Sequence, residues 1–325
     1  MCRKLCVFFL FLVAVAFGCA IVVVSYNGIF VNEHPSSHEA SALIENDSPE
    51  KDEHSQQPTS AAKESPSLPS DMMRLEADIR QFLGQRSEVW SVYVKNLDTD
   101  EVISLYNQPM EAASLIKLYV MQSCYRHRSE IITNDTIYTG DSRVSEARLD
   151  ELLYAMIAWS DNEAYNELVR MHSANRDFNE GCLQIQSEMP YPSTGIYHSL
   201  LPSDTAMTGI SYEKNHTSVA DCATLLESIA RGTCVSADAS GKMLELLGQQ
   251  QFREKIPAGL PQNVFCVNKS GENDHVQHDV AIIYGEQCTY ILCVMVKNCV
   301  DGRYTSQGMT SLSILVYDAL NSVCE

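Results

Sequence analysis

The segment from residue 263 to 298 most constrains the fold, because it holds three apolar runs of strand length in close succession. The runs read "NVFCVNKSG", "HDVAIIYGEQ" and "TYILCVMVKN", and they are rich in Val and Ile. Two earlier runs, at 89–97 and 101–106, alternate apolar and polar residues around the turn "DTD" and predict a hairpin. Strands before and after a helical stretch can form one antiparallel sheet with helices packed on it, so we expect the α+β class.

Helices are predicted wherever apolar residues recur every three to four positions. The predicted segments are 72–85, a helix that starts at Ser114, 147–160, 221–233, 241–252 and 310–323. The element order is therefore a helix, two strands, a helical middle, three strands and a final helix. No internal repeat is present in the sequence.

The N-terminus carries a long apolar segment that predicts a membrane anchor. Residues 5–24 are 20 positions without a charge, which is long enough to cross a bilayer as a helix. Basic residues precede this segment, and the next one along the chain is Lys51. The positive-inside rule then places the N-terminus in the cytoplasm and the rest outside. We expect 1–31 to stay in the cell membrane as a single-pass anchor. A cleaved signal peptide and a secreted protein are the alternative, and lipid modification of Cys19 fits less well because "AFGC" is a poor lipobox.

The composition changes between residues 32 and 70, where eight acidic residues, two lysines, five prolines and no aromatic residue occur. Such a segment cannot bury enough apolar surface to offset the entropy of ordering, so it predicts a disordered stalk. The folded domain then spans 71–325. The formal net charge of the whole chain is −19, which argues against nucleic acid as a partner.

The cysteines and histidines do not form a recognisable metal site. The chain has 12 cysteines and lacks the paired spacing of zinc ligands. The spacing of the cysteines is also unlike a disulfide framework, and whether one or two disulfide bonds form is left undecided. His275 and His278 have no evident third ligand, so we interpret them as ordinary loop and strand residues. Neither a metal nor another cofactor is expected.

One Ser-x-x-Lys pair stands out by its surroundings. Four such pairs occur in the chain, but only Ser114 and Lys117 lie at the start of an apolar helix that follows a predicted hairpin. Residues three apart share a helix face, so Lys117 can reach the hydroxyl of Ser114. Burial disfavours the charged form of a lysine, and a neutral amine can activate a serine. The simpler interpretation is a capping serine and a surface lysine.

Two further motifs favour the catalytic interpretation. Ser160-Asp161-Asn162 ends a buried helix, and Lys269-Ser270-Gly271 ends a predicted strand, where glycine permits a close approach of the backbone. Ser-x-x-Lys, Ser-Asp-Asn and Lys-Ser-Gly in this order resemble the motif set of class A β-lactamases and penicillin-binding serine hydrolases. The resemblance covers residues 75–323. It implies a five-stranded antiparallel sheet flanked by helices, an all-helical subdomain and a cleft between them.

The resemblance also implies roles for individual residues. Ser114 would be the acylated nucleophile, Lys117 its base and Ser160 the relay of a proton to the leaving nitrogen. Substrate would be bound by the Asn162 amide, by Lys269 and Ser270 at its carboxylate, and by an oxyanion hole beside Gly271 made of the backbone N–H groups of Ser114 and Glu272. The expected substrate is a small β-lactam or a peptidoglycan peptide, and the protein is expected to act as a monomer.

One expected motif of class A β-lactamases is missing. Their Glu-x-x-Leu-Asn loop supplies the glutamate that activates water for deacylation, and no glutamate between residues 166 and 217 is followed by Leu-Asn. Asp204 is the nearest acid in the corresponding loop and is a weak replacement. Three hypotheses therefore stand: a membrane-tethered hydrolase that turns over, a D-Ala-D-Ala-type cell-wall peptidase, and a penicillin-binding or sensor module that stays acylated.

Overall fold

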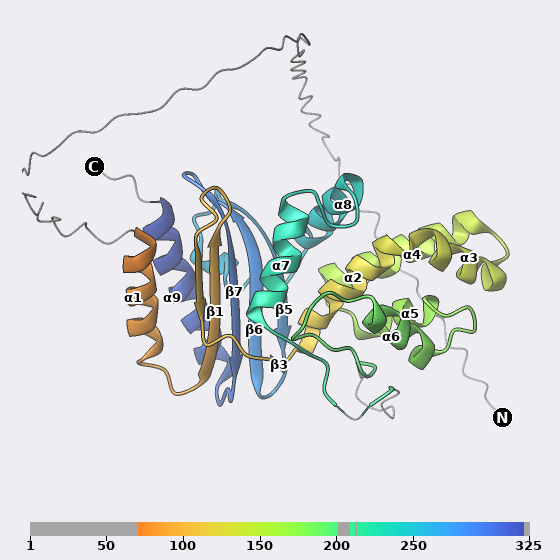
Figure 1. Ribbon diagram of the computed structural model, residues 1–325, viewed down its shortest axis with the longest axis horizontal. Coiled ribbons are helices and arrows are strands. Elements are labelled where there is room, and N and C mark those ends of the chain that lie inside the picture. Colours follow the sequence, from red (N-terminus) through yellow and green to blue (C-terminus); the bar gives the residue numbers. More distant parts are fainter. Residues whose placement is uncertain (1–70, 201–208, 212, 322–325) are drawn as a thin grey trace, which may run out of the picture. The chain divides into compact units, whose positions relative to one another are not determined.

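The computed structural model describes residues 71–200, 209–211 and 213–321 (Figure 1). Its main sheet has the strand order β2-β1-β7-β6-β5, and each neighbouring pair is antiparallel. The strands are β1 (Val89–Asn96), β2 (Val102–Leu105), β5 (Phe265–Glu272), β6 (Val276–Tyr284) and β7 (Thr289–Lys297). The predicted hairpin and the three later strands are thus confirmed, and they join where β1 pairs with β7.

The central strands are buried on both faces of the sheet. In β7, Leu292 and Val294 belong to the core beneath α1 (Asp71–Leu83) and α9 (Gly302–Asn321), whereas Cys293 and Met295 belong to the core on the other side. Figure 1 shows α1 and α9 over one face and α7 (Val219–Ala230) over the opposite face. Because both faces are covered, β7 reads as a continuous apolar run rather than an alternating one.

The helical region packs around α2, whose residues from Lys117 to Cys124 are all buried. Its other helices are α3 (Arg128–Thr139), α4 (Ser142–Ala158), α5 (Asn162–Met171), α6 (Phe178–Ser187) and α8 (Ala237–Gly248), and α2 itself is Lys117–Arg126. A short pair, β3 (Met110–Glu111) and β4 (His216–Thr217), connects the sheet half to the start of α2. This arrangement confirms the predicted class of an antiparallel sheet with helices and a helical subdomain.

Several predicted boundaries differ from the structure. The first turn after Ala112 is a 3₁₀-helix, η1 (Ala113–Ile116), and the α-helix begins only at Lys117. Helix α8 ends at Gly248, although the predicted helix runs to residue 252. The eight described cysteines are all buried and free, so they pack as small apolar residues.

The predicted anchor (1–31), the stalk (32–70) and Asp204 lie outside the described residues. Within the described part of the chain, no helix combines the length and apolar character needed to cross a bilayer.

Candidate active site

Ser114 lies in η1, directly after a residue with an unusual backbone conformation. Ala113 has φ of 45°, a region that L-residues other than glycine seldom adopt. The 3₁₀ turn has no side-chain cap, so Ser114 is not the capping residue that its position at a helix start first suggests. Backbone strain of this kind is held in place by surrounding packing and is concentrated at functional sites.

The amine of Lys117 is the centre of the site. Its Nζ lies 3.1 Å from Ser114 Oγ, 3.2 Å from Ser160 Oγ and 2.7 Å from Asn162 Oδ1, and it also donates to the backbone carbonyl of Ser160. Lys117 is fully buried. Burial lowers the pKa of Lys117 to about 7, and the nearby charge of Asp161 opposes this shift. A substantial share of Lys117 is therefore neutral near neutral pH.

Ser160 is held between two lysines by the junction of α4 and α5. It has φ of 56°, and the following Asp161 caps α5 by accepting from the N–H of Ala164 at 2.7 Å. This turn places Ser160 Oγ 2.9 Å from Lys269 Nζ, in addition to its contact with Lys117. A hydroxyl bonded to two amines can pass a proton along the chain of hydrogen bonds.

Lys269 reaches the same point from the edge strand β5. Its side chain is completely buried, and its Nζ also donates to the Ser270 carbonyl at 2.8 Å. Burial, followed by repulsion from Lys117, lowers the pKa of Lys269 well below its usual value. A carboxylate placed beside Lys269 would favour its charged form, so this lysine suits an anionic ligand.

Gly271 allows β5 to approach η1 closely. A Cβ atom at this position would lie 3.1 Å from Ala112 O, 3.1 Å from Leu115 N and 3.2 Å from Ser114 N. Any side chain would therefore press against the backbone N–H groups that surround Ser114. The predicted glycine is thus explained by a close approach, and not by a turn.

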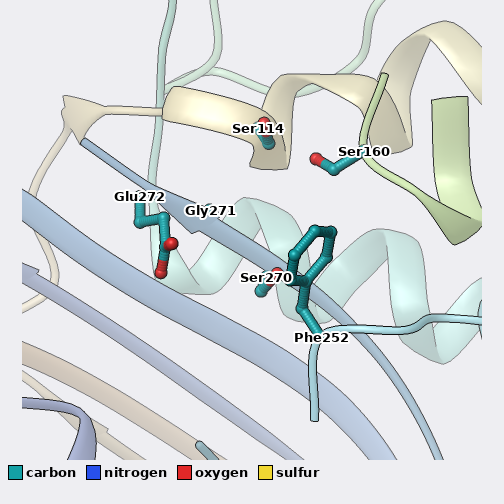
Figure 2. A pocket seen from close by; sticks show the side chains of 6 residues that line it. All are labelled: Ser114, Ser160, Phe252, Ser270, Gly271 and Glu272. Carbon is teal, nitrogen blue, oxygen red and sulfur yellow. The ribbon is translucent and has the colours of Figure 1, made fainter. Parts of the chain in front are cut away.

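The residues meet at a cavity of about 60 Å³ (Figure 2). It is lined by Ser114, Ser160, Phe252, Ser270, Gly271 and Glu272. All eight residues singled out in the sequence lie in or next to this cavity: Ser114, Lys117, Ser160, Asn162, Lys269, Ser270, Gly271 and Glu272. The structure thus brings together three motifs that are far apart in the chain.

Two features of the site escape sequence reasoning. Phe252 lines the cavity, and the buried Lys255 holds the Glu272 carboxylate at 2.8 Å. Both residues lie on the loop after α8, where no local motif marks them. The role of both residues depends on contacts with β5, which lies later in the chain. No pattern within the loop itself predicts those contacts.

His278 does not act as a metal ligand in this arrangement. Its Nε2 donates to the Glu111 carbonyl at 2.8 Å, and its Nδ1 accepts from the Val296 N–H at 3.2 Å. Burial lowers the pKa of His278 to about 4, so the ring is neutral with both nitrogens engaged. Within the described ranges, no group of three His, Cys, Asp or Glu side chains has the arrangement of a metal site.

The comparisons with known proteins agree with this geometry. The model of the beta-lactamase enzyme family matches residues 74–320. The structure of PBP-A superimposes with a TM-score of 0.61 at 21% identity, covering 76% of this chain and 96% of that one. A β-lactamase from Sphaerobacter thermophilus gives 0.60 at 16% identity, with 79% and 99% covered. An ancestral class A β-lactamase of Gram-negative bacteria gives 0.60 at 17%, with 75% and 99% covered.

No curated protein sequence matches the chain significantly. The solved structures show the same fold, and the family model covers most of the sequence, including all three motifs. The chain therefore belongs to the beta-lactamase enzyme family and is a β-lactamase-like serine hydrolase.

Proposed function

We propose that Ser114 forms an acyl-enzyme with a β-lactam or a related amide. The observation that carries this proposal is the buried Lys117 amine, 3.1 Å from Ser114 Oγ and with its pKa lowered to about 7. A neutral amine at this distance can remove the serine proton as the oxygen attacks the carbonyl carbon. A surface lysine with an ordinary pKa would stay protonated and could not do so.

The other residues supply the rest of an acyl transfer. The carbonyl oxygen becomes negative in the transition state, and the backbone N–H groups of Ser114 and Glu272 beside Gly271 would stabilise it. When the C–N bond breaks, the leaving nitrogen takes a proton from the Ser160 hydroxyl, which is replenished through Lys117. Lys269 and Ser270 would bind the substrate carboxylate, and Asn162 would bind its amide.

Release of the acyl group has less support than its formation. Glu167 is bound by Arg148 and Arg176 and lies near Arg170, so this carboxylate belongs to an ionic cluster of the helical region. Among the described residues that line the cavity, Glu272 is the one acid, and Lys255 holds it. We therefore propose slow deacylation, as in a penicillin-binding module or a D-Ala-D-Ala-type peptidase acting poorly on β-lactams.

A second solved structure of PBP-A supports the acylation step. It is described as a leucine-to-glutamate mutant in an acyl-enzyme complex with penicillin G, and it matches this chain with a TM-score of 0.58 at 20% identity. The match covers 78% of this chain and 98% of that one. A protein of this fold therefore forms an acyl-enzyme with a β-lactam, and this supports the same reaction at Ser114.

The test is incubation of the full chain in detergent with a chromogenic cephalosporin, while colour and intact mass are followed together. We expect a burst of colour with a mass adduct that persists after free drug is removed. The Ser114→Ala variant should show no adduct. Sustained colour without an adduct would contradict slow deacylation, and absence of both signals would overturn the acylation itself.

We also propose that the domain lies outside the cytoplasm, tethered through residues 5–24. The charge pattern before this apolar segment supports the orientation. Protease added to spheroplasts should cleave between residues 32 and 70 and release the domain, while a cytoplasmic marker stays intact. Resistance of the chain until the cells are lysed would contradict this orientation.

A further inference from the structure

Phe252 presents an aromatic ring to solvent inside the cavity. It is 40% exposed, although it lies on the loop between α8 and β5 close to residues that are deeply buried. The exposed part of Phe252 gains nothing for folding where it stands, because the hydrophobic contribution scales with the area removed from water. A ligand that covers the ring would recover that contribution.

The N–H of Phe252 is held by a buried side chain. It donates to Gln250 Oε1 at 3.1 Å, and Gln250 Nε2 donates in turn to the Ile157 carbonyl at 2.9 Å near the end of α4. Gln250 is 2% exposed. The neighbouring Gln251 N–H also donates to the Ala158 carbonyl at 3.0 Å. The loop is thus fastened to the helix that leads into Ser160.

The carbonyl of Phe252 is held by a second buried network. It accepts from Asn268 Nδ2 at 3.1 Å, and the same amide donates to Asp279 Oδ1 at 2.9 Å. Asp279 Oδ2 accepts from the Ile256 N–H at 3.0 Å, so the carboxylate fastens the other end of the loop. Buried polar groups are costly unless they are satisfied, and these satisfy one another while fixing the backbone of Phe252.

The Phe252 ring lies on the side of the cavity where Ser160 and Ser270 lie. Figure 2 shows it beside Ser160 and Ser270, with Glu272 on the opposite side. Under the proposed function, on which this step rests, Ser160 protonates the leaving nitrogen and Ser270 binds the carboxylate of the leaving portion. Phe252 therefore borders the space that the leaving portion of the substrate would occupy.

We propose that Phe252 is a specificity-determining residue, a fixed apolar wall that contacts a flat apolar group on the leaving portion of the substrate. Substrates that carry such a group should acylate Ser114 faster than substrates with a small group there. Among β-lactams, the matching class is cephalosporins with an aromatic substituent on the six-membered ring. Preorganisation of the loop backbone means that little ordering is needed when the substrate binds.

The experiment compares two cephalosporins with the same acylamino side chain, one with an aryl-vinyl group and one with a methyl group at the six-membered ring. The second-order acylation rate constant of each is measured with the full chain and with Phe252→Ala. The ratio of the two rate constants should fall about tenfold in the variant, the size of discrimination that apolar pockets achieve. Dividing the wild-type ratio by the variant ratio removes the intrinsic reactivity of the two drugs.

Phe265→Ala is the matched control, because Phe265 is another exposed phenylalanine, 57% exposed, with its ring centroid 5.4 Å from that of Tyr284 and outside the cavity lining. It should keep the wild-type ratio, and Phe252→Leu should keep most of it even if Phe252→Ala folds poorly. An unchanged ratio in folded Phe252→Ala, or an equal fall in Phe265→Ala, would overturn the inference alone. Failure of both drugs to acylate would overturn the proposed function, and this inference with it.

Discussion

Replacing Lys117 with alanine is expected to slow acylation of Ser114 by on the order of 10²- to 10⁴-fold, the usual contribution of a positioned general base. The amine lies 3.1 Å from Ser114 Oγ, and among the described residues no second lysine forms a hydrogen bond with that atom. Lys269 contacts Ser160 and the carbonyl of Ser270 instead. Without Lys117 the Ser114 hydroxyl must lose its proton to water, which is a much weaker base than a neutral amine.

The measurement is the rate of mass adduct formation with a penicillin, followed by quenching at set times. Lys242→Ala is the control, because Lys242 is exposed on α8 and forms an ion pair at 2.9 Å with Asp238 on the same helix. Thermal unfolding should confirm that both variants are folded. If Lys117→Ala formed the adduct within about tenfold of the wild-type rate, Lys117 would not be the base.

The same lysine predicts a pH dependence with a definite direction. Burial lowers its pKa from 10.5 to about 7, so the neutral amine accumulates as the pH rises through that value. The acylation rate should therefore rise between about pH 6 and about pH 8 and then level off. Lys117→Ala should lose this rise. A rate that kept increasing to about pH 10 would indicate an ordinary lysine pKa.

Much of the fold is readable from the sequence, because three of its strands are long apolar runs, the first hairpin alternates apolar and polar residues, and several helices show apolar residues at helical spacing. The five strands of the sheet follow from these patterns. The end of α8 does not, because Gln250 leaves the helical pattern to bind the Ile157 carbonyl. The predicted helix runs past Gly248 to residue 252, but the structure ends it at Gly248 and uses Gln250 in a tertiary contact instead.

The site was predictable to the extent that its chemistry is local. Ser114 and Lys117 share a turn, and the other two motifs are three-residue units, so their types and spacing are visible in the sequence. Lys255, Asp279 and Phe252 are different, because each matters through a partner on another element. A buried carboxyl such as that of Asp279 has no local signal, since its stability depends on donors that only folding brings near.

Replacing Gly271 with alanine is expected to slow acylation about 10²-fold, the lower end of the cost of losing one oxyanion-hole donor. The added Cβ would lie 3.1 Å from Leu115 N and 3.2 Å from Ser114 N. Those atoms belong to the backbone of η1, so relief requires the turn that carries Ser114 or the edge of β5 to move by a few tenths of an ångström. Displacement of the turn or of the strand edge moves the attacking Ser114 oxygen and the N–H donors away from the positions that the substrate carbonyl group requires.

Gly241→Ala separates this effect from the general effect of changing a glycine. Gly241 lies in α8, and no atom of the described residues lies within 4 Å of a Cβ built there. Alanine at that position should leave acylation unchanged and stabilise the protein by roughly 0.5–1 kcal/mol, because the unfolded chain loses freedom. The two variants should therefore differ in adduct formation, which is slowed in Gly271→Ala and unchanged in Gly241→Ala, while both proteins stay folded. Equal adduct rates in both would mean that the close approach of β5 to η1 serves packing, and that the charge on the carbonyl oxygen is stabilised elsewhere.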